Sequence, residues 1–262
     1  MDENRGECRM KHYVQTDVGK VRKVNEDAAA VAKKTDTTIL AIVADGMGGH
    51  LAGDVASRLT VETFVDEWNK WDFTSVNKSD AEAWLKETVS KTNKVVFEKA
   101  NSDKNCAGMG TTVVAAICTD TFISIGHIGD SRAYVNDEQG FRQLTEDHSL
   151  VGELVRTGQL SEEDAHYHPR KNVILKAVGT DPELVPDIIT LDWDKNDTLL
   201  LCTDGLTNKI SDEELHQSLL LNDMSDTPNH LIQLANDRGG EDNISVVVVH
   251  HSAGDDSDDA GR

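Results

Sequence analysis

The chain has 262 residues, of which 38 % are apolar and 28 % charged, as is typical of a soluble globular protein with a sizeable core. Its formal net charge is −21, which argues against nucleic acid or an anionic membrane as a partner, since both select basic surface. There is no apolar segment long enough for a transmembrane helix or a signal peptide, and the four cysteines form no C-x-x-C pair. We therefore expect a cytoplasmic protein without a disulfide framework or a zinc site.

The chain divides into one domain with two polar ends. Residues 1–10 are expected to form a polar leader, and the Asp-, Gly- and Ser-rich residues 252–262 a disordered acidic tail. No Pro- or Ser-rich linker interrupts residues 11–251, so we expect a single domain there.

The predicted elements come in groups of strands and groups of helices. In chain order, the apolar patterns predict strands near 12–18, 27–33 and 38–45, helices over 52–70 and 79–101, strands over 111–118, 122–128, 133–135 and 141–144, a mixed region of short helices and loops over 147–182, strands near 186–191 and 198–203, helices over 211–221 and 227–238, and a last strand over 244–250. Grouped elements favour an α+β fold with antiparallel sheets over a doubly wound parallel one. With this many strands, two packed sheets flanked by helices are the expected architecture.

Several side chains in these elements are expected to pack rather than to act. Trp68, Trp71 and Trp84 lie at helical spacing, which is typical of helix packing. Cys118 and Cys202 lie in apolar runs, where cysteine behaves as a small core residue.

Two apolar runs end on Asp-Gly, at Asp45 and at Asp204. An aspartate at the end of a buried strand is costly unless a positive charge meets it. Two such aspartates far apart in the sequence suggest that the fold gathers carboxylates around a cation. A site built only of carboxylates favours hard metals such as Mg²⁺ or Mn²⁺, which are typical of phosphate chemistry.

Three further acids flank apolar strands: Asp27, Asp130 and Asp242. For any one of these acids the simpler interpretation is a turn, because Asp-Gly and Asp-Asn are common turn formers. The glycine-rich segments 45–50 and 239–243 hold more glycine than a turn needs. Glycine allows close backbone approach, so the Gly46 carbonyl is itself a candidate ligand.

Six segments in this order resemble the metal-dependent serine/threonine phosphatases of the protein phosphatase 2C type. They are NED at 25–27, VADGMGG at 43–49, GMGTT at 108–112, GDSRA at 129–133, CTDGL at 202–206 and EDNIS at 241–245. Segments 144–151 and 168–174 resemble the short bacterial branch of that family, whose members oppose membrane-bound serine/threonine kinases. Lys171 and Lys176 stand where arginine is common in that branch, which keeps the charge but not the bidentate geometry.

The resemblance implies a fold, a cofactor and a set of site residues. The fold would be a sandwich of two antiparallel β-sheets flanked by α-helices in four αββα layers, with residues 11–251 as the catalytic domain. The cofactors would be two Mn²⁺ or Mg²⁺ ions per chain, with a weaker third site. By resemblance, Asp45 bridges the two ions and the Gly46 carbonyl is also a ligand, while Asp204 and Asp242 hold one ion. Asp27 holds metal-bound water, and Asp130 forms the third site with Asp204. Arg22 binds the substrate phosphate.

The implied reaction is hydrolysis of phosphoserine and phosphothreonine in proteins by a hydroxide that bridges the two metal ions. Members of the family from animals often carry a histidine as general acid just after the bridging Asp-Gly, where this chain has Met47, so the proton donor is unassigned. His50, His127 and His148 lie near the motifs, but each is more readily a surface or packing histidine. The expected partners are phosphorylated proteins and a serine/threonine kinase, and the expected state is a monomer.

Three alternatives share parts of this pattern. One is a non-catalytic phosphoprotein-binding relative, which the presence of every expected acid disfavours. Another is a two-metal nuclease, which the acidic charge disfavours. The last is a phosphatase that resets a single anti-sigma antagonist, although such proteins usually carry additional sensor or membrane segments.

Overall fold

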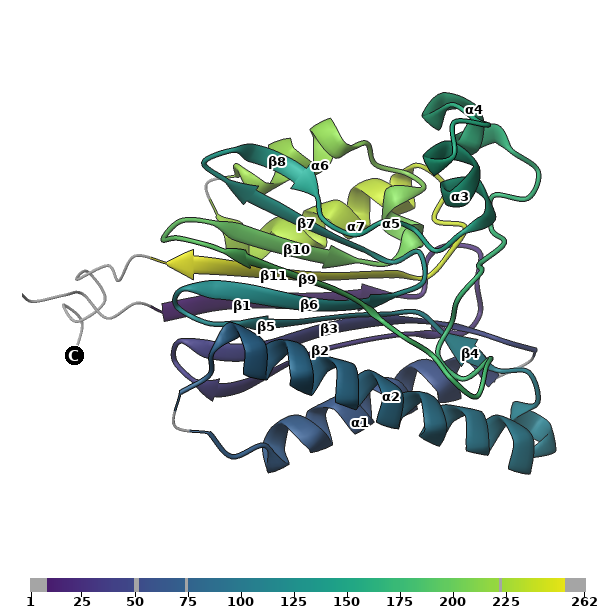
Figure 1. The fold of residues 1–262 in the computed structure, drawn as a ribbon. Helices are drawn as coiled ribbons and strands as arrows, with labels where there is room; N and C mark the ends of the chain where they lie inside the picture. Colours follow the sequence, from purple (N-terminus) through teal and green to yellow (C-terminus); the bar gives the residue numbers. More distant parts are fainter. Residues whose placement is uncertain (1–8, 50–51, 74, 222, 253–262) are drawn as a thin grey trace, which may run out of the picture.

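Two antiparallel β-sheets stacked face to face form the centre of the computed structural model, and helices cover both outer faces (Figure 1). The structure describes residues 9–49, 52–73, 75–221 and 223–252. This is the four-layer αββα arrangement expected from the grouped elements.

The first sheet has the strand order β1-β11-β10-β7-β8. Its strands are β1 (Arg9–Asp17), β7 (Arg132–Asp137), β8 (Gly140–Gln143), β10 (Thr198–Cys202) and β11 (Ile244–Ser252). The first and last strands are paired along their whole length, from Arg9 opposite Ser252 to Asp17 opposite Ile244. Every residue of β10 is buried, as its uninterrupted apolar sequence predicts for a strand covered on both faces.

The second sheet has the order β2-β3-β5-β6-β9, with the short β4 added to the end of β3. Its strands are β2 (Asp27–Thr35), β3 (Thr38–Met47), β4 (Gly110–Thr111), β5 (Val113–Cys118), β6 (Phe122–Ile128) and β9 (Asp187–Asp192). The expected strand over 111–118 is wrong in one respect, because it is interrupted at Thr112. The Thr112 N–H donates to the Asp45 carbonyl at 2.9 Å and so turns the backbone away from the β5 ladder.

The helices form the outer layers. On the second sheet lie α1 (Ala52–Lys70) and α2 (Lys78–Ser102), and on the first lie α5 (Asp204–Thr207), α6 (Asp212–Leu219) and α7 (Thr227–Asp237). Short 3₁₀ turns occur at Lys104–Cys106 and Met224–Asp226. Three apolar cores result, one between the sheets and one between each sheet and its helices.

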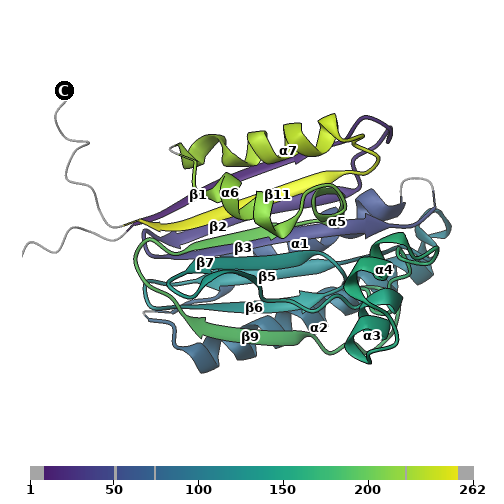
Figure 2. The same ribbon diagram turned by 90° about the horizontal axis from the view of Figure 1, so that it is seen from above.

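A flap, defined here as residues 147–182, stands at one end of the sandwich. It contains α3 (Leu150–Arg156) and α4 (Glu162–Tyr167), which lie together at that end of the sheets (Figure 2). Ser149 and Ile174 form a bridge within the flap, and Val178 of the flap forms a second bridge to Thr111 of β4. The expected mixture of short helices and loops is therefore confirmed.

The ends of the domain differ from the expected boundaries. The strand β1 begins at Arg9, so the last two residues assigned to the polar leader belong to the first sheet, and Met10 is buried. Likewise Ser252, which was assigned to the tail, is the last residue of β11. Residues 1–8 and 253–262 lie outside the described residues.

An aromatic cluster fixes the two long helices to the second sheet. The Trp68 ring is fully buried, with ring centroids 5.6 Å from Trp71 and from Trp84 and 5.7 Å from Phe73. The expected packing role of these tryptophans is confirmed. Cys118 and Cys202 are buried free thiols, also as expected.

Trp68→Ala should lower the free energy of unfolding by about 3–5 kcal/mol, because it leaves a large cavity at the centre of this cluster. Trp71→Ala is the matched control, since the half-buried Trp71 stacks on the outside of Trp84. Its loss should be clearly smaller in the same urea titration. Equal losses would contradict the central place given to Trp68.

Candidate metal centre

Asp27 and Asp45 are brought together by strand pairing. Asp27 begins β2, and the antiparallel register places it directly opposite Asp45 near the end of β3. Side chains of directly opposed residues lie on the same face with Cβ atoms about 4.5–5.5 Å apart. The two carboxylates therefore lie close together, although Asp45 comes 18 residues after Asp27 in the chain.

The other sheet supplies Asp204 and Asp242. Asp204 is the first residue of α5, directly after β10, and Asp242 comes two residues before β11. Thr203, which precedes Asp204, connects the two sheets, because its hydroxyl donates to Asp27 Oδ2 of the second sheet at 2.8 Å. The same Thr203 oxygen accepts the Ser245 N–H at 2.9 Å.

Asp130 joins from the loop that follows β6. Its neighbour Ser131 shares a 2.7 Å hydroxyl hydrogen bond with Thr112, and the Thr112 hydroxyl also accepts the Asp45 N–H at 2.9 Å. The Asp130 loop is thus tied to the end of β3. Asp130 itself is only 8 % exposed.

Mutual repulsion and burial dominate the electrostatics of this cluster. Burial, and then the charges of Asp204 and Asp242, raise the pKa of Asp27 to about 7 against the opposing effect of the Thr203 hydrogen bond. Burial and then Asp204 raise the pKa of Asp130 to about 7. Burial, followed by Asp27 and the other carboxylates, raises the pKa of Asp45 well above its usual range, and burial followed by Asp242 raises that of Asp204. Such a set of acids is ionised together only when positive charge is supplied.

The oxygen atoms of the cluster suit a hard cation. Four buried carboxylate oxygens have no hydrogen-bond partner among the described residues: Glu26 Oε1, Asp27 Oδ1, Asp130 Oδ1 and Asp204 Oδ1. Only oxygen donors are gathered here, which fits Mg²⁺ or Mn²⁺ better than Zn²⁺.

Glu26 was missed by the sequence analysis. A Cβ built on Gly53 of α1 would lie 2.5 Å from Glu26 Oε1 and 2.8 Å from the Gly46 carbonyl oxygen, so these two oxygens converge where glycine leaves room. Glu26 also accepts the Gly46 N–H through its own carbonyl at 3.0 Å. The available signal was its place directly before Asp27 in the NED segment.

Arg22 lies at the rim of the cluster. Its Nη2 donates to Asp242 Oδ2 at 2.9 Å, its Nε donates to the Glu241 carbonyl at 3.3 Å, and its Nη1 lies 4.0 Å from Glu26 Oε2. With 47 % of its side chain exposed, it is a cation that an anion approaching the cluster can reach.

The histidines considered as proton donors do not converge on the cluster. His127 is fully buried in β6, and its ring stacks on that of His148 with centroids 4.7 Å apart. His50 lies outside the described residues. Met47 ends β3 and is half-buried, so the structure adds no donor at that position.

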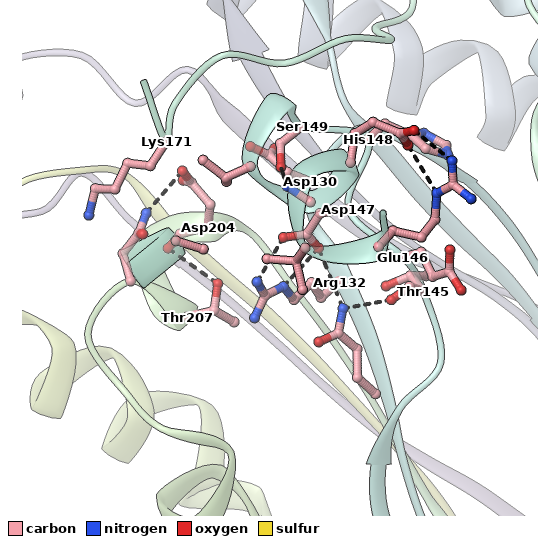
Figure 3. Close-up of a pocket in the computed structure, with 18 of the residues that line it drawn as sticks. Asp130, Arg132, Thr145, Glu146, Asp147, His148, Ser149, Lys171, Asp204 and Thr207 are labelled. Carbon is pink, nitrogen blue, oxygen red and sulfur yellow. Dashed lines mark hydrogen bonds and ion pairs between the residues drawn. The ribbon is translucent and has the colours of Figure 1, made fainter. Parts of the chain in front are cut away.

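A cleft of about 1080 Å³ opens beside the cluster, between the flap and the start of α5 and α6. Asp130 and Asp204 of the cluster line this cleft, as do Lys171 and Lys176 of the flap. Figure 3 shows Asp204 and Lys171 on one side of this cleft and the paired Arg132 and Asp147 on the other.

The sequence matches the family described as protein phosphatase 2C over residues 18–235. It is 44 % identical over 236 residues to the serine/threonine phosphatase stp of Listeria monocytogenes, covering 90 % of this chain and 93 % of the relative. Among solved structures, the serine/threonine phosphatase of S. agalactiae is similar with a TM-score of 0.86 and 36 % identity, covering 92 % of this chain and 99 % of that one. The catalytic domain of the serine threonine protein phosphatase PstP in complex with two manganese ions is similar with a TM-score of 0.81 and 30 % identity, covering 93 % and 99 %.

The raised pKa values predict how stability depends on pH when metal is withheld. In EDTA, the melting temperature should fall as the pH rises from about 4 to about 7, because an unfolded Asp27 ionises near 3.8 while the folded one keeps its proton until about 7. Asp27→Asn should flatten this fall, and excess Mn²⁺ at pH 7.5 should raise the melting temperature again. Scanning calorimetry in a pH series measures both effects.

Asp120→Asn is the matched control, since Asp120 is exposed in the turn between β5 and β6 at the other end of the strands. A wild-type protein that gained stability in EDTA over the same pH range would contradict the electrostatics described for the cluster.

Proposed function

The chain belongs to the protein phosphatase 2C family and is a serine/threonine phosphatase, and we propose that it hydrolyses phosphoserine and phosphothreonine in proteins at the carboxylate cluster. One observation carries the assignment of the site: both sheets deliver carboxylates to one place, and four carboxylate oxygens there are buried without a hydrogen-bond partner within the described ranges.

The proposed cofactors are two Mn²⁺ or Mg²⁺ ions, as in the related structure that contains two manganese ions. Asp45 and the Gly46 carbonyl would ligate at the end of β3, Asp204 and Asp242 would hold one ion from the other sheet, and Asp27 would hold its water. Asp130 would form a third, weaker site with Asp204. When bound, such ions lower the pKa of a shared water and offset the charge of the phosphoryl oxygens.

The chain's own residues would orient the substrate. Arg22 presents a planar guanidinium at the exposed rim, and its donors suit two oxygens of one phosphate. Glu26 and Asp242 flank this guanidinium and restrict where it points. The buried Thr203 hydroxyl holds the Asp27 carboxylate in place from the opposite sheet.

The biological partner follows from the same assignment. We expect phosphorylated proteins as substrates and opposition to a serine/threonine kinase, which the resemblance to the bacterial branch supports. No helix in the described part of the chain is long and apolar enough to span a bilayer. A cytoplasmic location and a monomeric state stay predictions.

Asp204→Asn should abolish most of the metal-dependent activity. The change replaces a charged oxygen of the cluster by an amide, so phosphate release from a phosphothreonine peptide with Mn²⁺ should fall by about 100-fold or more. EDTA should abolish release by the wild-type protein. A malachite-green assay of released phosphate measures both.

Asp120→Asn serves again as the matched control and should keep wild-type activity. Equal release with and without metal would overturn the proposed mechanism. Bound Mn²⁺ without any release from phosphopeptides would favour the non-catalytic phosphoprotein-binding alternative.

Arg22→Ala should lower kcat/KM for the phosphopeptide by about 10- to 100-fold, because the phosphate loses its charged hydrogen-bond donor. Arg22→Lys should recover only part of this loss, since an ammonium keeps the charge but not the planar pair of donors. Steady-state kinetics with saturating Mn²⁺ separate the effect on the phosphate from any effect on metal affinity. An Arg22→Ala protein with unchanged kcat/KM would remove Arg22 from the site.

A further inference from the structure

His148 connects three separate parts of the structure. Its Nδ1 accepts the Gly129 N–H at 3.1 Å, and its own N–H donates to the Gly129 carbonyl at 2.7 Å. Its Nε2 lies 3.2 Å from Asp187 Oδ2 at the start of β9. Its carbonyl accepts the Leu175 N–H of the returning flap at 2.7 Å. The side chain is only 9 % exposed.

These contacts determine the tautomer of the ring. A backbone N–H can only donate, so the Nδ1 that faces Gly129 must carry a lone pair and the proton must be on Nε2. That proton then points to the Asp187 carboxylate. Both nitrogens of the neutral ring are thereby used.

The same tautomer argues against a metal ion at this place. His127, His148 and Asp187 offer ligand atoms within 4.8 Å of one another, which is a spacing compatible with a metal site. A metal at His148 Nε2 would require the proton on Nδ1, where it would face the Gly129 N–H. In addition, the two imidazole rings stack at an interplanar angle of 26°, whereas ligating rings direct their edges toward a common point.

The residue that His148 binds through Nδ1 is Gly129, which directly precedes Asp130. Gly129 has φ +108°, and a Cβ built on it would lie 2.5 Å from Thr112 Cγ2. The Gly129 backbone is thus confined between Thr112 on one side and His148 on the other. Because the Asp130 carboxylate is attached directly to this backbone, the hydrogen bond to His148 Nδ1 fixes the direction in which the carboxylate leaves the loop.

We propose that His148 is a positioning residue, which acts through Gly129 to aim the Asp130 carboxylate at the third metal ion. The proposal rests on the proposed function, in which Asp130 ligates that ion. His148 touches neither the substrate nor the two main ions in this scheme. The hydrogen-bond acceptor at Nδ1 is the feature that matters, and Asp187 keeps that nitrogen unprotonated by accepting the proton on the opposite one.

A pair of amide variants separates the two ring nitrogens. His148→Asn keeps an acceptor at the position of Nδ1 but loses the contact to Asp187, whereas His148→Gln reaches Asp187 but no longer offers an acceptor to Gly129. Titration of Mn²⁺ into each protein, followed by isothermal calorimetry and by the electron paramagnetic resonance of free Mn²⁺, gives the affinity of each class of site. Asp130→Asn identifies the third ion in the same titration.

We expect His148→Gln to weaken the third ion by about tenfold, the size of one lost hydrogen bond, while His148→Asn changes it by less than about threefold. The two tighter ions should bind all variants as they bind the wild-type protein. In the ¹⁵N NMR spectrum of the wild-type protein, His148 should show the Nε2–H tautomer, and the Gly129 amide should shift in His148→Gln. Asp187→Ala provides a second variant, on the opposite side of the His148 ring from Gly129, and should weaken the third ion in the same direction.

Equal weakening in the Gln and Asn variants, an unchanged third ion in His148→Gln, or the Nδ1–H tautomer would each overturn the positioning role. If Asp130→Asn itself left the third ion unchanged, the positioning role would fall together with the third site, while phosphatase activity with two ions would still stand. Loss of metal-dependent activity in the wild-type protein would instead reject the proposed function. Thermal unfolding in EDTA shows whether each variant is folded.

Discussion

The repulsion among buried carboxylates is the constraint on which the rest of this structure depends. Asp27 and Asp45 come from one sheet, and Asp204 and Asp242 flank the inner strands β10 and β11 of the other. Burial raises the pKa of Asp27, Asp45 and Asp204. No element of the fold would place such groups together for stability alone. The sandwich supplies the rigid frame that holds them: β3 and β10 are buried strands whose ends cannot move apart without exposing the core between the sheets.

The sequence predicted this cluster well because its members follow a simple rule. Each of Asp27, Asp45, Asp204 and Asp242 lies within two residues of an apolar run, and apolar runs are the clearest sequence signal of a buried sheet. The same apolar patterns explain why most helices and strands lie within a few residues of their expected bounds. The short helix α5 was missed because four residues carry no periodic pattern.

The supporting residues were less predictable, since their roles depend on partners far away in the sequence. Glu26 is one of many acids in a chain of net charge −21, and its place before Asp27 was its one signal in the sequence. In the structure, its convergence with the Gly46 carbonyl beside Gly53 distinguishes it. Thr112 and Thr203 lie within or beside apolar runs, where threonine is an ordinary strand residue. Their hydroxyl groups matter because one bonds across to Ser131 and the other crosses between the sheets to Asp27. The spacing of residues along the chain does not predict these two hydrogen bonds.

The pairing of β1 with β11 has a consequence for how the protein is made. Among the described residues, the first strand of the domain lies beside the last one, and Asp242 stands just before that last strand. Until residues 242–252 have been synthesised, Arg22 has no Asp242 to meet and the cluster lacks one of its acids. A chain that ends before Asp242 therefore lacks both the central strand β11 of the first sheet and one carboxylate of the proposed metal site. The first sheet and the carboxylate cluster are thus completed together, when β11 takes its place between β1 and β10.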